Sequence, residues 1–317
     1  IGRRNLQTTF QCGAHEFRNH VRECNPRTLV HDHFIFSHFC FADDGRINQQ
    51  LTNQKSITTP TIIYLYAMDP CTHTYISNYF IHSTAGGMKL YLKAGPKGTD
   101  VGDCPFAHFV RLVLEEKKLE YDLIPTTMDT KPNWLIEHYE GKLPALEHSK
   151  ECYIESNIIC EYLDFFFPSD PVMKITKRME EAEDVIGDFF PTMVRYIKKT
   201  DDNSENDSEA REDLGACLSR IEAYLQTVRD GDGDDGAADG NDEYYLCGKN
   251  VSLLDCSFIP KLYHMTVTVD EFKNGQPALG DYPLLESYFQ RFSERESFAA
   301  TVYPKETVIW GWNNARN

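Results

Sequence analysis

Residues 88–118, MKLYLKAGPKGTDVGDCPFAHFVRLVLEEKK, pass from one backbone periodicity to another on either side of a single cysteine, Cys104. Residues 89–94 form a short apolar run that predicts a strand. After Pro105, apolar side chains recur at the spacing of one helix face, which predicts a helix over 105–118. That face consists of Phe106, Phe109, Val110, Val113 and Leu114. The stretch therefore predicts a strand, a loop, and a helix that begins at the cysteine.

The residues up to 168 continue this alternation. YDLIPTT (121–127), LPALEH (143–148) and CYIES (152–156) predict strands, with a loop between the first two, and SNIICEYLDFFF (156–167) predicts an apolar helix that ends at Pro168. Strand, helix, strand, loop, strand, strand, helix is the order of a thioredoxin-like domain. A helix that joins two parallel strands also fits the right-handed crossover rule. We expect an α/β thioredoxin-like domain over residues 88–170.

From residue 171 to 317 the pattern is helical, and it predicts an all-α domain. Acidic stretches near 200–213 and 230–243 are expected to be solvated loops. The second could alternatively bind calcium, but it lacks the glutamate that completes an EF-hand loop. Ser252 and Asp255 have the spacing of a capping box, which predicts the start of an apolar helix with a kink at Pro260. Another helix carries heptad-like apolar steps at Leu214, Leu218, Ile221, Leu225 and Val228.

Residues 1–87 differ from the rest of the chain. They hold most of the eleven histidines, they show no sustained periodicity, and Met88 follows them directly. We interpret them as an unassigned leader that is either disordered or an artefact of the gene model, with a targeting segment as a further alternative. The histidines near Cys24 and Cys40 match no zinc-binding spacing, so we predict no metal site.

Composition narrows the function. The formal net charge of −17 argues against binding to nucleic acid or to anionic lipid. No stretch has the roughly 18–20 uninterrupted apolar residues that span a membrane. The ten cysteines include no CxxC pair, and several lie in apolar helical runs, so a reducing compartment such as the cytoplasm is expected.

Cys104 has two interpretations: a reactive thiol or a buried structural sulfur. A thiol at the first turn of a helix is near the positive end of the helix dipole and near unpartnered N–H groups, which favour the thiolate and are expected to lower its pKa. Pro105 suits the first helical position. Asp103 opposes the thiolate. Ala107 stands where a disulfide oxidoreductase has its second cysteine, so an external thiol would have to regenerate Cys104.

Two later features favour the reactive interpretation. Pro144 stands at the start of a strand, where thioredoxin-like domains keep a cis-proline whose preceding residue, here Leu143, pairs with a peptide-like ligand. Glu155 and Ser156 lie at a strand-to-helix junction. Ser156 is a natural N-cap, and the same helix start could instead hold a ligand carboxylate while Glu155 binds an ammonium group. Together with Cys104, these residues predict a glutathione site.

At this point the chain resembles the glutathione transferase superfamily, and within it the dehydroascorbate reductases. The resemblance covers residues 89–312. The chloride intracellular channel proteins share its first part, but the KLYH run and the tryptophan-bearing tail favour the reductases. Its marks are LKAGPKGTDVGDCPF, LEEKKLEYDL, KPNWL, GKLPAL, ESNII, VSLLDCSFIPKLYHM and VIWGW.

The resemblance implies a monomeric enzyme, without a metal, that reduces dehydroascorbate to ascorbate with two glutathiones. Cys104 would be the nucleophile, with Lys93, Asp103 and His264 at the dehydroascorbate. Glutathione would be held by Lys131, Leu143, Pro144, Glu155 and Ser156. The location would be cytoplasmic, or plastid if the leader is a targeting segment.

The chain departs from this family after the cysteine. The family usually reads Cys-Pro-Phe-Ser-Gln-Arg, whereas residues 104–109 read Cys-Pro-Phe-Ala-His-Phe. His108 is expected to be a solvated histidine, with a titratable group at the site as the alternative. Glu155 stands where these reductases more often have aspartate.

Two other functions use the same features. One is an omega-type thiol transferase that removes glutathione from proteins through the same cysteine. The other is a channel-like redox protein that inserts into membranes. Charged residues interrupt residues 88–112, which argues against insertion.

Overall fold

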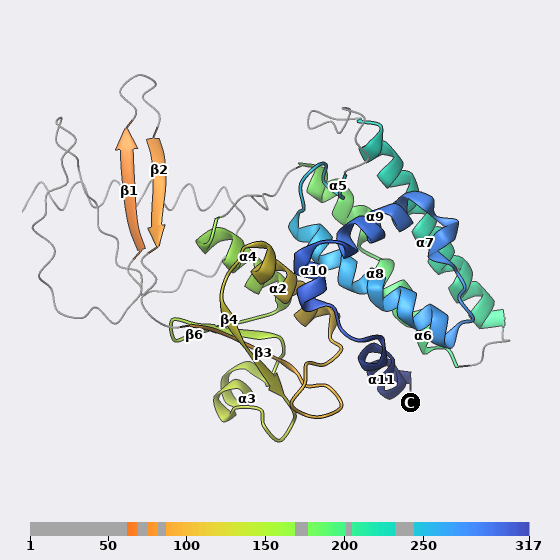
Figure 1. Ribbon diagram of the computed structural model, residues 1–317, viewed down its shortest axis with the longest axis horizontal. Coiled ribbons are helices and arrows are strands. Elements are labelled where there is room, and N and C mark those ends of the chain that lie inside the picture. The colour runs from red at the N-terminus through yellow and green to blue at the C-terminus, as the bar shows by residue number, and fades with distance from the viewer. Residues whose placement is uncertain are drawn as a thin grey trace, which may run out of the picture. The chain divides into compact units, whose positions relative to one another are not determined.

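The strand that precedes Cys104 is an inner strand of a four-stranded mixed sheet with the order β4-β3-β5-β6 (Figure 1). β3 (Met88–Lys93) runs parallel to β4 (Tyr121–Thr126) and antiparallel to β5 (Ala145–His148), which pairs with β6 (Glu151–Ile154). The computed structural model describes residues 62–68, 75–81, 87–168, 177–200, 205–231 and 244–316. The strands and the thioredoxin-like order expected from the sequence are confirmed.

Both faces of the sheet are covered. Leu90 and Leu92 are fully buried in the main core, together with helices α2 (Pro105–Glu116) and α4 (Ser156–Phe166). Tyr91 points to the opposite face, because side chains alternate along a strand. It belongs to a smaller cluster with Leu135 of α3 (Asn133–Tyr139). Figure 1 shows α2 and α4 on one side of the sheet and α3 on the other.

α3 corrects the expected loop between the second and third strands. It begins after Pro132 and ends at Glu140, which has the left-handed φ of 55°. Leu135 is its only fully buried residue, so the segment has no apolar stripe from which its helical period could be recognised.

The remaining helices form the second domain. α8 is its central helix and packs against α2 of the first domain as well as against α5, α6, α9 and α11. The elements are α5 (Lys177–Ile186), α6 (Phe189–Lys198), α7 (Glu205–Arg229), α8 (Leu253–Phe272), η1 (Leu279–Asp281), α9 (Pro283–Ser293), α10 (Glu296–Thr301) and α11 (Lys305–Arg316).

α7 corrects part of the first predicted acidic loop, because residues 205–213 are helical. Asp207 in this run is buried, and its carboxylate lies 2.6 Å from Lys273 Nζ at the end of α8. A buried ion pair therefore anchors one of the residues that were expected to be solvated. Most of the second acidic stretch, residues 232–243, lies outside the described residues.

The capping box at the start of α8 is confirmed. Ser252 Oγ accepts a hydrogen bond from the Asp255 N–H, and the Asp255 carboxylate accepts one from the Ser252 N–H at 2.7 Å. Pro260 lies inside α8, as expected.

α10 fastens the second domain to α2. Arg295 donates from Nε and Nη2 to the two oxygens of Glu116, at 2.8 and 2.7 Å, and Ser297 donates to the same carboxylate. Burial alone would raise the pKa of Glu116, but the hydrogen bonds from Arg295 and Ser297 outweigh it and lower that pKa. Two parallel bonds fix both the distance and the direction of the contact.

The leader was assigned no element from the sequence, and two of its segments are strands. β1 (Ile62–Met68) and β2 (Tyr75–Ile81) pair antiparallel, with Ile62 opposite Ile81. The rest of the leader up to residue 86, including Cys24 and Cys40, lies outside the described residues. That the leader is disordered or a gene-model artefact stays a prediction.

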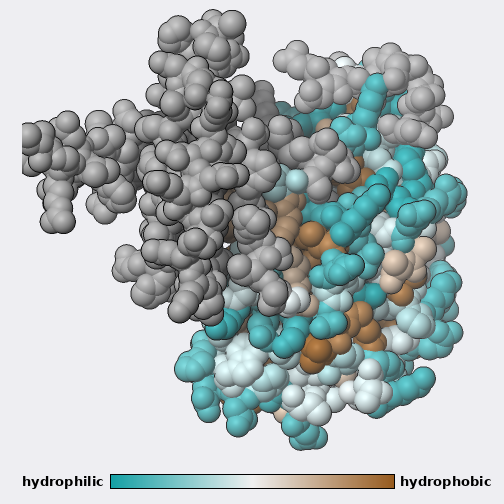
Figure 2. Space-filling model, turned by 60° about the vertical axis from the view of Figure 1, so that its left-hand side comes forward, coloured by the Kyte–Doolittle hydropathy of each residue, from teal (hydrophilic) through white to brown (hydrophobic). Residues whose placement is uncertain are grey.

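Figure 2 shows a mostly hydrophilic surface with smaller apolar patches. Among the helices described, none is both long and apolar enough to cross a membrane. Among the residues whose side chains the structure describes, the large apolar ones that are exposed are Phe106, Met128, Ile136, Ile158 and Phe165.

Candidate active site around Cys104

A close backbone contact places Cys104 at the end of β3. The N–H of Gly102 donates to the carbonyl of Lys93 at 2.8 Å. A Cβ on residue 102 would lie 2.5 Å from that same oxygen, so only glycine fits there. The turn brings Asp103 and Cys104 beside Lys93, and α2 then starts directly.

Cys104 is the N-cap of α2, with Pro105 in the first turn as expected. The Cys104 carbonyl accepts the N–H of His108 at 3.0 Å and the hydroxyl of Tyr303 at 3.1 Å. The α2 helix and the α10–α11 connection therefore both hold the backbone of the cysteine. The residue itself is partly buried.

The expected lowering of the Cys104 pKa is wrong. Burial raises the pKa of this thiol above its ordinary value of 9.0, because a thiolate loses hydration inside the protein. The N–H groups of Ala107 and Phe106 act in the opposite direction, as the helix-start argument requires, and so does Lys93. Asp103 adds to the increase. In the free protein, burial is the larger effect.

Lys93 and Asp103 form an ion pair at 2.6 Å directly before the cysteine. The Asp103 side chain is 12% exposed, while that of Lys93 is 45% exposed. Lys93 Nζ also lies 5.2 Å from the centre of the Trp310 ring on α11. The positive charge thus stands between a buried carboxylate and an aromatic face, with one side open to solvent.

The register of the sheet places the predicted glutathione-binding residues at the same end of the sheet as Lys93. The Leu143–Pro144 peptide is cis, as expected. Ala145 pairs with Tyr91 and with Ile154, so the register extended by one residue places Pro144 between Leu92 and Glu155. Leu143, Pro144 and Glu155 therefore lie at the sheet end that also carries Lys93.

Glu155 has a left-handed φ of 65° and is the N-cap of α4. Its carboxylate lies 3.1 Å from Lys142 Nζ, with both side chains about half exposed. Ser156, expected as the cap, is instead the first helical residue, and no side chain caps this end of α4. The first N–H groups of α4 are thus available to a ligand, since helix starts favour anions.

Lys131 approaches this end of the sheet from the β4–α3 loop. A Cβ on Gly141 would lie 2.9 Å from Lys131 Cδ, so the lysine side chain passes over Gly141, just before Lys142 and Leu143.

His264 of α8 is buried and does not line an open surface. Its Nδ1 accepts from Trp312 Nε1 at 3.0 Å, so its proton is on Nε2. That N–H has no hydrogen-bond partner among the residues described. Burial lowers the pKa of His264 to about 4, while the charge of Asp103 raises it and that of Lys93 lowers it. The histidine is therefore a neutral donor close to the Lys93–Asp103 pair.

The expectation of a solvated His108 is wrong: the side chain is fully buried. Thr301 Oγ1 donates to the carbonyl of Ser297 at 2.7 Å, so at 3.1 Å it accepts from His108 Nε2. Burial is the main cause that lowers the pKa of His108 well below 6.5. Ala107 is buried in the same core. His108 is thus a neutral interdomain contact.

Four residues near the predicted site come from α11 and the segment that leads into it: Tyr303, Trp310, Gly311 and Trp312. In the sequence, the VIWGW motif marks the family resemblance and suggests no role for these residues. Each of these residues touches a predicted site residue. The two tryptophans on either side of a glycine were the sequence feature that could have pointed to a role for this segment. The sequence alone, however, does not show which end of the sheet a helix so far along the chain covers.

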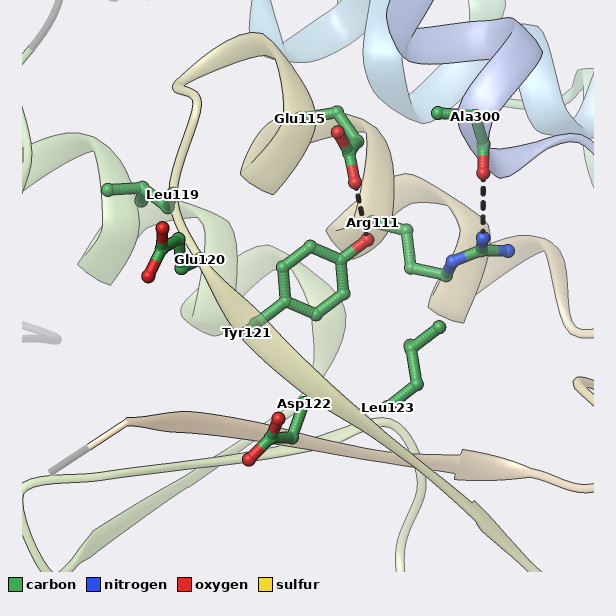
Figure 3. A pocket seen from close by; sticks show the side chains of 8 residues that line it. All are labelled: Arg111, Glu115, Leu119, Glu120, Tyr121, Asp122, Leu123 and Ala300. Carbon is green, nitrogen blue, oxygen red and sulfur yellow. Dashed lines mark hydrogen bonds between the residues drawn. The ribbon is translucent and has the colours of Figure 1, made fainter.

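A hollow of about 450 Å³ lies elsewhere, between α2, the start of β4 and α10 (Figure 3). None of the predicted site residues lines it. Arg111 is one of its lining residues and donates to the carbonyls of Thr301 and Ala300, at 2.7 and 3.2 Å, where α10 ends. Its main feature is therefore a cation that stabilises the end of a helix.

The site around Cys104 combines a nucleophile, a lysine that can stabilise negative charge, and a buried N–H donor. Next to them are a strand start with a cis-proline and an uncapped helix N-terminus. This arrangement suits thiol chemistry on a small polar electrophile, with an extended peptide-like thiol as the second ligand.

Comparisons with known proteins agree with the fold. A family model for the glutathione S-transferase N-terminal domain matches residues 100–165. Glutathione S-transferase DHAR3, chloroplastic, of Arabidopsis thaliana is 29% identical over 213 residues, which is 67% of this chain and 74% of that protein. The probable cytosolic glutathione S-transferase DHAR1 of Oryza sativa subsp. japonica is 28% identical over 71% of this chain and 97% of its own length.

Among solved structures, dehydroascorbate reductase of Chlamydomonas reinhardtii superposes with a TM-score of 0.59 and 24% identity, over 72% of this chain and 98% of that one. A tau-class glutathione S-transferase from Mangifera indica gives a TM-score of 0.58 over the same share. At these identities the likeness concerns the fold. With a thioredoxin-like domain followed by a helical domain, a matching N-terminal domain and these named relatives, the chain is similar in fold and in sequence to the glutathione transferase superfamily.

Proposed function

We propose that this protein reduces dehydroascorbate to ascorbate at the expense of two glutathiones, with Cys104 as the nucleophile. The observation that carries the proposal is the juxtaposition of Cys104 with the Lys93–Asp103 ion pair at the sheet end that holds the cis Leu143–Pro144 peptide. The names of the relatives support the choice of substrate. The names of a chloroplastic and a cytosolic relative favour action in a plastid or in the cytosol. A monomeric enzyme is what the family resemblance implies.

Glutathione would bind along the start of β5. The backbone of Leu143 would pair with its peptide groups, as an added strand does. The uncapped start of α4 at Ser156 would receive its γ-glutamyl carboxylate, and Glu155 its ammonium group. Lys131, which crosses Gly141, would reach its other carboxylate.

The reaction would start with attack of the Cys104 thiolate on a carbonyl carbon of dehydroascorbate. Lys93, whose side chain is open to solvent on one side, would stabilise the developing oxyanion. Water would then attack the sulfur, so that the carbon–sulfur bond breaks, ascorbate leaves with both electrons, and Cys104 becomes a sulfenic acid.

Two glutathiones would restore the thiol. The first condenses with the sulfenic acid, which releases water and leaves a mixed disulfide. The second attacks that disulfide, which frees the Cys104 thiol and releases glutathione disulfide. An external thiol is needed because Ala107 occupies the place of a second cysteine.

The test is the rate of ascorbate formation by the purified chain, followed by absorbance with and without glutathione. Wild type should form ascorbate only with both substrates, and Cys104→Ser should lower the rate by at least about a thousandfold, since a serine hydroxyl is a far weaker nucleophile at neutral pH. Cys152→Ser is the matched control, because Cys152 is also partly buried in the same domain, and it should keep most of the activity.

Two results would contradict the proposal. If Cys104→Ser keeps most of its rate, another group is the nucleophile. If wild type ignores dehydroascorbate but removes glutathione from a glutathionylated peptide, the protein is a thiol transferase of the omega type.

A further inference from the structure

Gly311 lies where the carboxylate of Asp103 leaves no room for a side chain. A Cβ built on Gly311 would stand 1.8 Å from Asp103 Oδ2, 2.1 Å from Cγ and 2.7 Å from Oδ1. The first two distances are far below van der Waals contact, and the third is also shorter than the 3.0 Å that Cβ contacts observe. The carboxylate therefore packs directly on the backbone of α11.

The helix cannot slide away to admit a side chain. On one side of Gly311, the Trp310 ring lies 5.2 Å from Lys93 Nζ. On the other side, Trp312 donates to His264 at 3.0 Å from a buried position. Because the two neighbours of Gly311 are fixed to different elements, β3 and α8, the register of α11 over Asp103 is fixed as well.

Asp103 cannot retreat without losing its partner. Its carboxylate is nearly buried, and its Oδ1 is held 2.6 Å from Lys93 Nζ. A methyl group at residue 311 would have to push the carboxylate off Lys93 or push α11 off the site. Glycine inside a helix is otherwise disfavoured relative to alanine, so its presence here has a specific packing reason.

We propose that Gly311 is a positioning residue: the absence of a side chain there lets the α11 backbone hold Asp103 against Lys93, and this contact sets the charge that dehydroascorbate meets beside Cys104. The inference rests on the proposed function for the substrate, but the packing part of it does not. It adds a residue of the last helix that acts only through another side chain.

The first test is a double-mutant cycle on thermal unfolding of the full chain. Gly311→Ala should lower the melting temperature by about 4 °C or more, although Gly→Ala in a helix normally raises it. In an Asp103→Ala background the carboxylate that would clash with the new methyl group is absent. The same Gly311→Ala substitution should then leave the melting temperature unchanged or raise it.

Gly215→Ala is the matched control, because Gly215 is also inside a helix and its Cβ would meet only Tyr282 Oη at 3.4 Å. It should not lower the melting temperature, and it should leave activity unchanged. The packing argument is overturned if Gly311→Ala is as stable as wild type, or if its loss persists in the Asp103→Ala background.

The second test separates the two substrates kinetically. In Gly311→Ala, kcat/KM for dehydroascorbate should fall by about tenfold or more, because a small displacement of a positioning group has a large effect. KM for glutathione should stay within about twofold, since Gly311 and its two neighbours contact Asp103, Lys93 and His264, none of which is assigned to glutathione. Equal loss for both substrates would overturn the positioning role.

If wild type does not reduce dehydroascorbate at all, the proposed function fails while the thermal cycle still decides the Gly311–Asp103 contact. The two failures are therefore distinguishable.

Discussion

At the scale of the residue, the pKa of the Cys104 thiol is set by electrostatic effects that oppose one another. The helix start and Lys93 favour the thiolate, whereas burial and Asp103 oppose it. The outcome, a raised pKa, means that little thiolate is present in the free protein near neutral pH. Reactivity should then depend on pH and on the two charges beside the sulfur.

The rate of Cys104 alkylation by iodoacetamide should therefore keep rising above pH 9, because the fraction of thiolate grows until the pH passes the raised pKa. Asp103→Asn removes a negative charge next to the sulfur and should move the midpoint of the profile to lower pH. Lys93→Met removes the positive charge and should move it to higher pH. Mass spectrometry of the labelled peptide gives the rates.

Cys104→Ser, which has no thiol at this position, supplies the background for that measurement. A wild-type midpoint below pH 8.5, or shifts of equal sign in the two charge variants, would contradict this balance of charges.

The sequence predicted the local elements that carry these residues better than the environment of their side chains. A cysteine before a proline and a helical stripe, a Leu-Pro at a strand start, and a Glu-Ser at a helix start are local patterns, and the structure has each element at its expected place. Burial is not local. His108 is buried because Thr301, far along the chain, packs on it, and no spacing near residue 108 shows this.

At the scale of the element, α8 depends on its N-terminal cap. The buried Asp255 carboxylate accepts hydrogen bonds from the N–H of Leu246, the N–H of Ser252 and the hydroxyl of Tyr288. It connects the helix start to the preceding loop and to α9.

Ser252→Ala should lower the free energy of unfolding by about 1 kcal/mol, the usual effect of losing a cap. Asp255→Ala should lower it by about 3 kcal/mol, because it leaves several buried donors without an acceptor. Urea unfolding followed by far-UV circular dichroism measures both. As a control, Ser208→Ala, at an exposed side-chain contact on α7, should change stability by less than about 0.5 kcal/mol. If Ser252→Ala and Asp255→Ala lowered stability equally, the additional hydrogen bonds that Asp255 accepts from Leu246 and Tyr288 would not stabilise the protein as described.

Elements with a clear apolar pattern or capping residues were predictable, whereas elements with few buried apolar residues or an acidic composition were not. β3, α2 and the start of α8 carry clear periodicity or capping residues. α3 has a single buried residue, and the first turns of α7 read as solvated because of their acidic composition. Asp207 is paired with Lys273, which is far from it in the sequence, and the local composition around Asp207 gives no sign of this partner.

At the scale of the whole molecule, stability should decrease as the pH falls below 6.5. Burial lowers the pKa of His264 to about 4, and it lowers that of His108 well below the ordinary value. In this pH range the unfolded chain binds protons that the folded chain excludes, so acid favours unfolding. His264 alone should remove about 2 kcal/mol at pH 5.

Urea unfolding at pH 7.5, 6 and 5 tests this. His108→Gln, whose amide can still donate to Thr301, should make the pH dependence smaller. His138→Gln changes an exposed histidine on α3 and should leave it as in wild type. Equal stability of wild type at pH 7.5 and pH 5 would contradict the burial of neutral histidines.

The docking of α10 on α2 limits how this chain could be divided or recombined. Glu116, Arg111 and His108 all lie on α2, yet their hydrogen-bond partners belong to the second domain. In a chimaera of this thioredoxin-like domain with the helical domain of a relative, the polar side chains of α2 would lose their hydrogen-bond partners unless α10 of this protein was kept as well. The two domains are therefore expected to be inherited together. Recombination between relatives, or an engineered domain exchange, would preserve the site only if α2 and α10 came from the same protein.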